Sequence, residues 1–121
     1  MRKATKKGFT LVELVIVIVI VGILSIVAVP LYRGYLRRAI STEATSLLSA
    51  INTAQRVYST EYGEYLEVPE TSVNTILDVD ARSNKYFTSF TIRKSGNSYS
   101  AVTEGVGGAT GISATILGAE I

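Results

Sequence analysis

One long apolar segment stands near the N-terminus of the chain. Residues 14–31 carry no charge, and Ser25 supplies their only hydroxyl group. A hydrocarbon core of about 30 Å takes roughly 20 helical residues, whereas a strand has about five or six residues. The segment, extended back to Phe9, therefore predicts a membrane-spanning helix over 9–31. The alternative, a buried core helix, needs a larger surrounding protein than the residues after Leu31 supply.

After Leu31 the pattern becomes amphipathic at helical spacing. Polar residues alternate with apolar ones that recur at steps of three or four: Leu36, Ile40, Ala44, Leu47, Ile51, Ala54 and Tyr58. One face is therefore expected to pack against a core. The two segments together predict a continuous helix over 9–60. Gly22 and Pro30 fall inside it, and Pro30 is expected to kink it because Pro30 has no N–H to bond to Ile26.

Strand patterns follow the helix. Residues 86–94 alternate, a Ser-Gly-Asn turn follows, and 97–103 continue as a second strand, which is the pattern of a hairpin. A glycine-rich loop leads to a third strand over 112–117. No strand is predicted for Pro69 and the polar stretch that follows it to Asn84. The predicted fold class is α+β, a long N-terminal α-helix packed on a small antiparallel sheet. The head, 61–121, is expected to hold about three strands.

Composition excludes most catalytic chemistry. The chain has no Cys and no His, so it lacks thiol nucleophiles, imidazole bases and the metal sites that these groups build. The glycine-rich loop 105–111 has no following Lys-Ser/Thr and cannot serve as a phosphate-binding loop. Neither an enzyme nor a cofactor is expected.

Three carboxylates in the second half of the chain are candidate ligands for a calcium ion. Asp78, Asp80 and Glu104 could contribute oxygen ligands. They do not form a dense ligand loop, and the alternative is that they are solvated loop carboxylates. No metal site is predicted.

The net charge of +2 depends on the first residues of the chain. Four cations precede Phe9, and acids outnumber cations in the remainder, which argues against nucleic-acid binding. The same four cations predict a cytoplasmic N-terminus, although Arg33, Arg37 and Arg38 beyond the apolar segment reduce the asymmetry. No small-x-small cleavage site follows the apolar segment promptly, so we expect this segment to remain in the product.

Glu13 is the most informative residue, because a carboxylate at the head of an apolar helix is costly to insert into a membrane. Two interpretations are structural: Glu13 lies at headgroup level, or it stabilises the positive end of its own helix. A third follows if the chain is cut between Gly8 and Phe9. The new amino group of Phe9 could then neutralise Glu13 of another subunit.

Residues 6–14 read KKGFTLVEL and resemble the class III leader junction of type IV pilins and their relatives, including type II secretion pseudopilins. The resemblance implies that prepilin peptidase removes a cytoplasmic leader, 1–8, by cutting after Gly8, and that it N-methylates Phe9. It also implies that Glu13 pairs with a neighbour's N-terminal amine during assembly. Gly22 and Pro30 fall at family-like positions for helix packing and kinking.

The resemblance is strongest over 6–31 and weaker beyond it. Residues 62–65, Tyr-Gly-Glu-Tyr, resemble a family element after the long helix, except that Leu66 stands where Pro is usual. Unlike the best-known pilins, the chain has no Cys pair and cannot close a disulfide loop. The implied architecture is the pilin lollipop, with 9–31 as the transmembrane segment and later the filament core.

The function that the resemblance implies is that of a structural subunit of a type IV pilus or pilus-like filament. The precursor would be single-pass in the inner membrane, surrounded by lipid. It would then polymerise with copies of itself through an inner-membrane platform and its cytoplasmic ATPase. The product would be an extracellular pilus or a periplasmic pseudopilus. The alternatives are a type II secretion pseudopilin and a minor pilin with a binding role.

Overall fold

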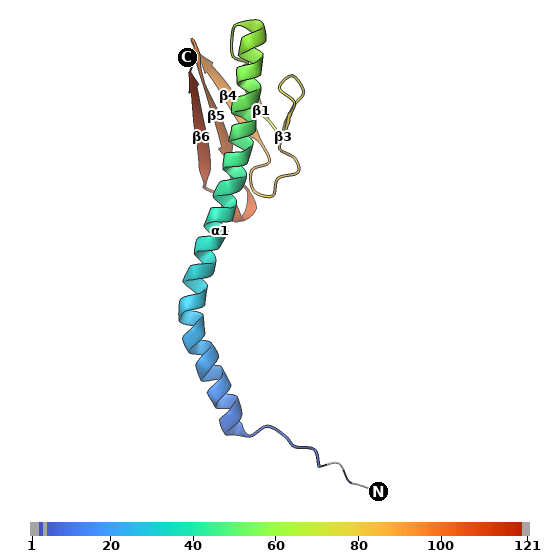
Figure 1. Cartoon of the computed structure of the whole chain (residues 1–121), viewed down its shortest axis with the longest axis vertical. Coiled ribbons are helices and arrows are strands. Elements are labelled where there is room, and N and C mark those ends of the chain that lie inside the picture. Colours follow the sequence, from blue (N-terminus) through green and yellow to red (C-terminus); the bar gives the residue numbers. More distant parts are fainter. Residues whose placement is uncertain (1–2, 4, 120–121) are drawn as a thin grey trace. The chain divides into compact units, whose positions relative to one another are not determined.

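The computed structural model describes residue 3 and residues 5–119. Residues 1, 2 and 4 of the predicted leader and 120–121 of the predicted head lie outside the described residues. The chain forms two compact units that divide between Arg37 and Arg38. Its elements (Figure 1) are, in order, α1 (Leu11–Tyr62), β1 (Val68–Thr71), β2 (Val73–Asn74), β3 (Val79–Asp80), β4 (Phe90–Ser95), β5 (Ser98–Glu104), the 3-10 helix η1 (Gly107–Ala109) and β6 (Ser113–Ala119).

The first unit contains the apolar half of α1. The α-helix continues through Pro30, and Ser25 Oγ donates to the Val21 carbonyl at 2.7 Å, so even the one hydroxyl group is satisfied within the helix. Repeated Val and Ile disfavour a helix in water. In lipid, however, a helix satisfies every backbone group internally. Among the described residues, α1 is the one helix long and apolar enough to span a membrane.

The second unit is built on the amphipathic half of α1. The buried face of the helix consists of Ile40, Ala44, Leu47, Leu48, Ile51 and Gln55. Apart from the adjacent Leu47 and Leu48, these residues recur at steps of three or four, which confirms the amphipathic pattern predicted from the sequence. It packs with inward-facing side chains of the sheet, among them Phe90, Ile92 and Tyr99, into one hydrophobic core. The fold is α+β, as predicted.

The main sheet is antiparallel, with the strand order β1-β4-β5-β6. Strands β4 and β5 form the predicted hairpin, closed at Ser95 and Ser98, with Gly96 at a φ of +58° in the turn. Strand β6 pairs with β5 along its whole length, from Ser113 to Ala119. A separate antiparallel pair, β2 and β3, lies within the segment between β1 and β4.

The expectation of about three strands is wrong. The main sheet has four strands, and β2 and β3 form a second sheet of two strands. Strand β1 contains Pro69 and falls where no strand is predicted from the sequence. Strand β1 is an edge strand with an irregular register between Val68 and Thr71, and Pro is tolerated at such edges and bulges. Strand β1 forms by pairing with β4, and the local sequence of β1 does not indicate this pairing.

The predicted strand 86–94 begins too early. Strand β4 starts only at Phe90, because the preceding backbone N–H groups have a different acceptor. Glu43, from α1, receives hydrogen bonds on Oε1 from the N–H groups of Tyr86 at 2.5 Å and Phe87 at 2.9 Å, and on Oε2 from that of Lys85 at 3.2 Å. One carboxylate of the helix thus fixes the segment that enters the sheet.

Two further polar side chains join α1 to the rest of the second unit. Gln55, fully buried, donates from Nε2 to the Leu66 carbonyl at 2.6 Å and accepts from the Leu66 N–H at 3.0 Å. Tyr99 donates its hydroxyl to Asn52 Oδ1 at 2.6 Å. Gly118 makes room for the Tyr99 ring, since a Cβ at Gly118 would lie 2.0 Å from a ring carbon.

We predict that Glu43→Gln destabilises the second unit by about 1–3 kcal/mol, because an amide cannot replace a carboxylate that accepts three N–H bonds. Burial alone would raise the pKa of Glu43, but hydrogen bonds from Tyr86, Phe87 and Lys85 outweigh it and lower the pKa below the ordinary 4.5. The stabilisation is therefore present above about pH 4.5 and is lost as the pH falls through the folded-state pKa.

Denaturant titrations in detergent micelles at pH 7 and at pH 3 measure this effect. The difference in stability between the parent and Glu43→Gln should be largest at pH 7 and should shrink at pH 3. Glu67→Gln, at an exposed position whose side chain makes no hydrogen bond or ion pair with the described residues, serves as the matched control and should leave both values unchanged. An equal effect of Glu43→Gln at both pH values would contradict the role of the ionised carboxylate.

Candidate functional site

The residues of the predicted cleavage junction directly precede α1. Gly8 and Phe9 lie outside any helix or strand, and the Phe9 side chain is 91% exposed. A Cβ built at Gly8 would meet nothing within 4 Å. The peptide bond between these residues therefore lies in an exposed backbone segment outside regular secondary structure.

Thr10 and Glu13 form a capping box at the start of α1. The Thr10 hydroxyl accepts a hydrogen bond from the Glu13 N–H at 3.2 Å, and Glu13 Oε2 accepts from the Thr10 N–H at 2.9 Å and from the Thr10 hydroxyl at 3.1 Å. This reciprocal pattern satisfies backbone donors that a helix start leaves without partners. In the single chain, Glu13 thus stabilises its own helix end.

Thr10 is the residue that the sequence interpretation missed. Its signal was available, because Thr followed three residues later by Glu, just before an apolar run, is the signature of a capping box. The box places the Glu13 carboxylate at the backbone of the residue that follows Phe9. The structure therefore brings Gly8, Phe9, Thr10 and Glu13 together at one end of the helix.

Gly22 and Pro30, the other predicted positions, lie farther along α1 and are both exposed. A Cβ at Gly22 would meet nothing within 4 Å, so Gly22 has no packing partner among the described residues. A packing or kinking role for either residue stays a prediction.

An apolar surface surrounds the helix beyond Glu13. The large apolar side chains from Leu11 to Leu31 are between 44% and 79% exposed. Continuous exposed apolar surfaces of this kind mark contacts with a membrane or with another protein. The capping box therefore heads a helix whose whole circumference is available for burial in lipid or against other helices.

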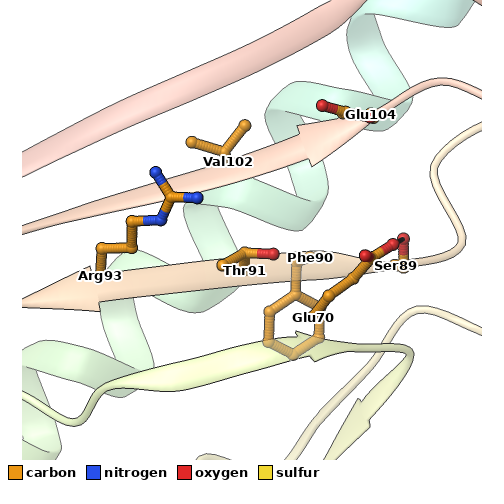
Figure 2. Close-up of a pocket in the computed structure, with 7 residues that line it drawn as sticks. All are labelled: Glu70, Ser89, Phe90, Thr91, Arg93, Val102 and Glu104. Atoms are coloured by element: carbon orange, nitrogen blue, oxygen red, sulfur yellow. Dashed lines mark hydrogen bonds between the residues drawn. The ribbon is translucent and has the colours of Figure 1, made fainter.

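The second unit carries an open pocket of about 290 Å³ on its sheet, shown in Figure 2. Glu70 reaches from β1 toward Ser89, whose hydroxyl donates to Glu70 Oε1 at 3.3 Å, and Arg93 extends from β4 toward Val102 (Figure 2). Glu104 lies at the far end of the pocket. These side chains offer neither a nucleophile with a base nor a converging ligand set.

The three carboxylates weighed as calcium ligands do not form a common ligand group among the described residues. Asp80 is held by Arg82 at 2.6 Å, and hydrogen bonds from that guanidinium lower the pKa of Asp80 to about 2. Glu104 lines the sheet pocket, whereas Asp78 borders a groove beside the end of α1. Within residue 3 and residues 5–119, no group of three metal-ligating side chains of the His, Cys, Asp or Glu type occurs.

Comparisons with known proteins cover about half of the chain or less. Residues 3–29 match the family model of the prokaryotic N-terminal methylation motif. A fimbrial protein of Neisseria meningitidis serogroup B is 48% identical over 60 residues, which are 50% of this chain and 35% of the relative. A fimbrial protein of Pseudomonas aeruginosa is 51% identical over 49 residues, 40% of this chain and 32% of the relative.

The type IV major pilin protein PilE1 of Neisseria gonorrhoeae is 47% identical over 62 residues, 51% of this chain and 38% of the relative. The chain thus spans about a third of the length of the curated relatives it matches. No solved structure matches the chain significantly. The resemblance to type IV pilins is confirmed for the N-terminal segment.

We predict that Thr10→Ala loosens the first turn of α1, because it removes the hydroxyl that accepts from Glu13 and donates to its carboxylate. Amide hydrogen exchange in micelles should accelerate about fivefold at Glu13 and Leu14, whose N–H groups bond to Thr10, and not in the middle of the helix, the factor expected for the loss of a typical N-cap. Thr10→Ser keeps the hydroxyl and should exchange as the parent does. Equal exchange in Thr10→Ala and the parent would contradict the capping role.

Proposed function

We propose that this chain, whose N-terminal segment resembles that of type IV pilins, is the precursor of a structural subunit of a type IV pilus or pilus-like filament. Prepilin peptidase cuts it after Gly8 and N-methylates Phe9. The subunit then polymerises with copies of itself through the first half of α1. Its work is assembly rather than catalysis.

The observation that carries the proposal is an accessible Gly8-Phe9 junction immediately before a carboxylate-headed apolar helix with an exposed surface. Lipid covers this surface in the precursor, which is anchored in the inner membrane with its N-terminus in the cytoplasm. In the filament, the same surface is buried against neighbouring helices. An inner-membrane platform and its cytoplasmic ATPase supply the transfer between these two environments, since the chain has no nucleotide-binding loop.

In the proposed function, Glu13 has different partners before and after cleavage of the chain. Before cleavage its carboxylate bonds to the Thr10 N–H and hydroxyl. After cleavage the amino group of Phe9 is a cation, and a charge-assisted bond to an ammonium is stronger than a bond to a neutral donor. A carboxylate left without a cation inside an apolar filament core would be strongly unfavourable. The requirement for a pair therefore selects one register between neighbouring helices.

The first test is the intact mass and N-terminal sequence of the protein in fibres sheared from the cell surface. The proposal predicts a dominant fibre component that begins at N-methyl-Phe9. Processed protein confined to membranes would favour a type II secretion pseudopilin or a minor subunit instead. An uncut chain that begins at Met1 would contradict the assignment of the Gly8-Phe9 junction.

A second test separates pairing between subunits from capping within one subunit. Glu13→Ala should still be cleaved, but its fibre yield should fall by at least about tenfold because no carboxylate remains to meet the amino group of Phe9. Thr10→Ala is the matched control, since it breaks the same capping box and keeps the carboxylate. Its fibres should form. Equal loss of fibres in both variants would show that only the cap matters.

A further inference from the structure

An exposed aromatic and acidic groove lies where α1 ends beside the turn between β2 and β3. Tyr58 and Tyr62 stack there with ring centroids 4.5 Å apart, and Tyr62 remains 65% exposed. Ile76 across the groove is also 65% exposed. The groove has a volume of about 290 Å³. We call it the tyrosine groove and define it by Val57, Tyr58, Glu61, Tyr62, Ile76 and Asp78.

The tyrosine groove carries negative charge without compensation. Glu61 lies in the last turn of α1, which contains no basic residue, so a carboxylate stands at the negative end of the helix dipole. Asp78 lies on the opposite side of the groove. Within the described part of the chain, neither carboxylate has an ion pair or a side-chain hydrogen bond, in contrast to Asp80 with Arg82 and Glu64 with Lys94. The groove is therefore suited to a cationic partner.

A surface of opposite charge lies on the first unit, where the apolar segment of α1 ends. Tyr32 and Leu36 are neighbours on the helix at a spacing of four residues, as are Arg33 and Arg37, and the two rows are adjacent. Tyr32 is 67% exposed, Leu36 is 39% exposed and both arginines are exposed. The arginines have no ion pair among the described residues, and no acid occurs between Glu13 and Glu43. We call these four residues the arginine face.

We propose that the tyrosine groove of one subunit binds the arginine face of a second copy. Two guanidinium groups meet two carboxylates, and guanidinium planes stack favourably on exposed tyrosine rings. Leu36 and Tyr32 supply apolar area against Val57 and Ile76. This contact rests on the proposed function, because both require copies of the chain to associate. It means that the second unit, and not only the apolar surface of α1, determines how the copies assemble.

The two surfaces differ from each other, so the contact is heterologous. Each copy presents one tyrosine groove and one arginine face. A chain of copies joined in this way therefore has an unfilled tyrosine groove at one end and an unfilled arginine face at the other. Such a contact propagates into an open polymer when the rotation between neighbouring copies does not close a ring. An isologous contact of one surface with itself would instead stop at a dimer.

Charge reversal in the full-length chain tests the proposal through the yield of surface fibres. Arg33→Glu with Arg37→Glu should lower the yield at least about tenfold, and so should Glu61→Arg with Asp78→Arg, because like charges then face each other. The chain that carries all four reversals should recover to within about threefold of the parent. Cleavage after Gly8 and the amount of processed protein in membranes are measured in every variant, so that only processed subunits are compared.

The outcomes separate this inference from the proposed function. Normal fibres from either double reversal, or a processed fourfold variant that does not recover, would overturn the contact, the latter because the arginines would then have another partner such as lipid phosphate. The filament function would stand in both cases. Absence of fibres from the parent chain itself would overturn the function and the contact together.

Cross-linking supplies a measurement that does not depend on fibre yield. The chain has no cysteine, so each thiol can be placed at will. Fibres of Arg37→Cys with Glu61→Cys, treated with a short bismaleimide, should give a ladder of covalent multimers in denaturing gels. Arg37→Cys with Ser113→Cys places the second thiol on exposed β6 and serves as the matched control without a ladder. Fibres with no ladder, or an equal ladder in the control, would contradict the contact.

Discussion

The apolar surface of α1 between Leu11 and Leu31 is the constraint on which the other features of this chain depend. A helix with large side chains exposed around its whole circumference is unstable in water, because the folded chain itself buries none of them. Lipid and a bundle of similar helices are the two surroundings that can cover it. The capping box stabilises the start of α1, and the amphipathic second half of α1 packs into the hydrophobic core. One helix therefore has an exposed apolar half and a half that is buried on one face.

The sequence predicts those features that depend on residues close together in the chain. The apolar segment, the amphipathic face and the hairpin of β4 and β5 follow from periodicity and turn residues, and the structure confirms them. Strand β1 could not be found this way, because Pro69 opposes a strand locally and only pairing with β4 makes it one. The start of β4 was misplaced for a similar reason, since Glu43 is more than forty residues away from the N–H groups it accepts.

The N-terminal site was predictable to a different degree at each residue. Gly8, Phe9 and Glu13 were identified from one contiguous motif, and the family comparison covers that motif. Thr10 was not identified, although Thr10 and Glu13 have the spacing of a capping box and form one in the structure. The tyrosine groove was not predictable, since Tyr62 and Ile76 are brought together by the turn between β2 and β3, which leaves no periodic signal.

The second unit is held to its helix by Glu43, Gln55 and the hydroxyl of Tyr99, each of which bonds to a partner on another element. None of these contacts is covalent, and the chain contains no thiol. The head can therefore reach its folded structure without an oxidant or a disulfide isomerase, and a reducing environment cannot undo it. Its integrity is set by protonation and packing, so the folding of this chain is independent of the redox machinery that disulfide-closed proteins require.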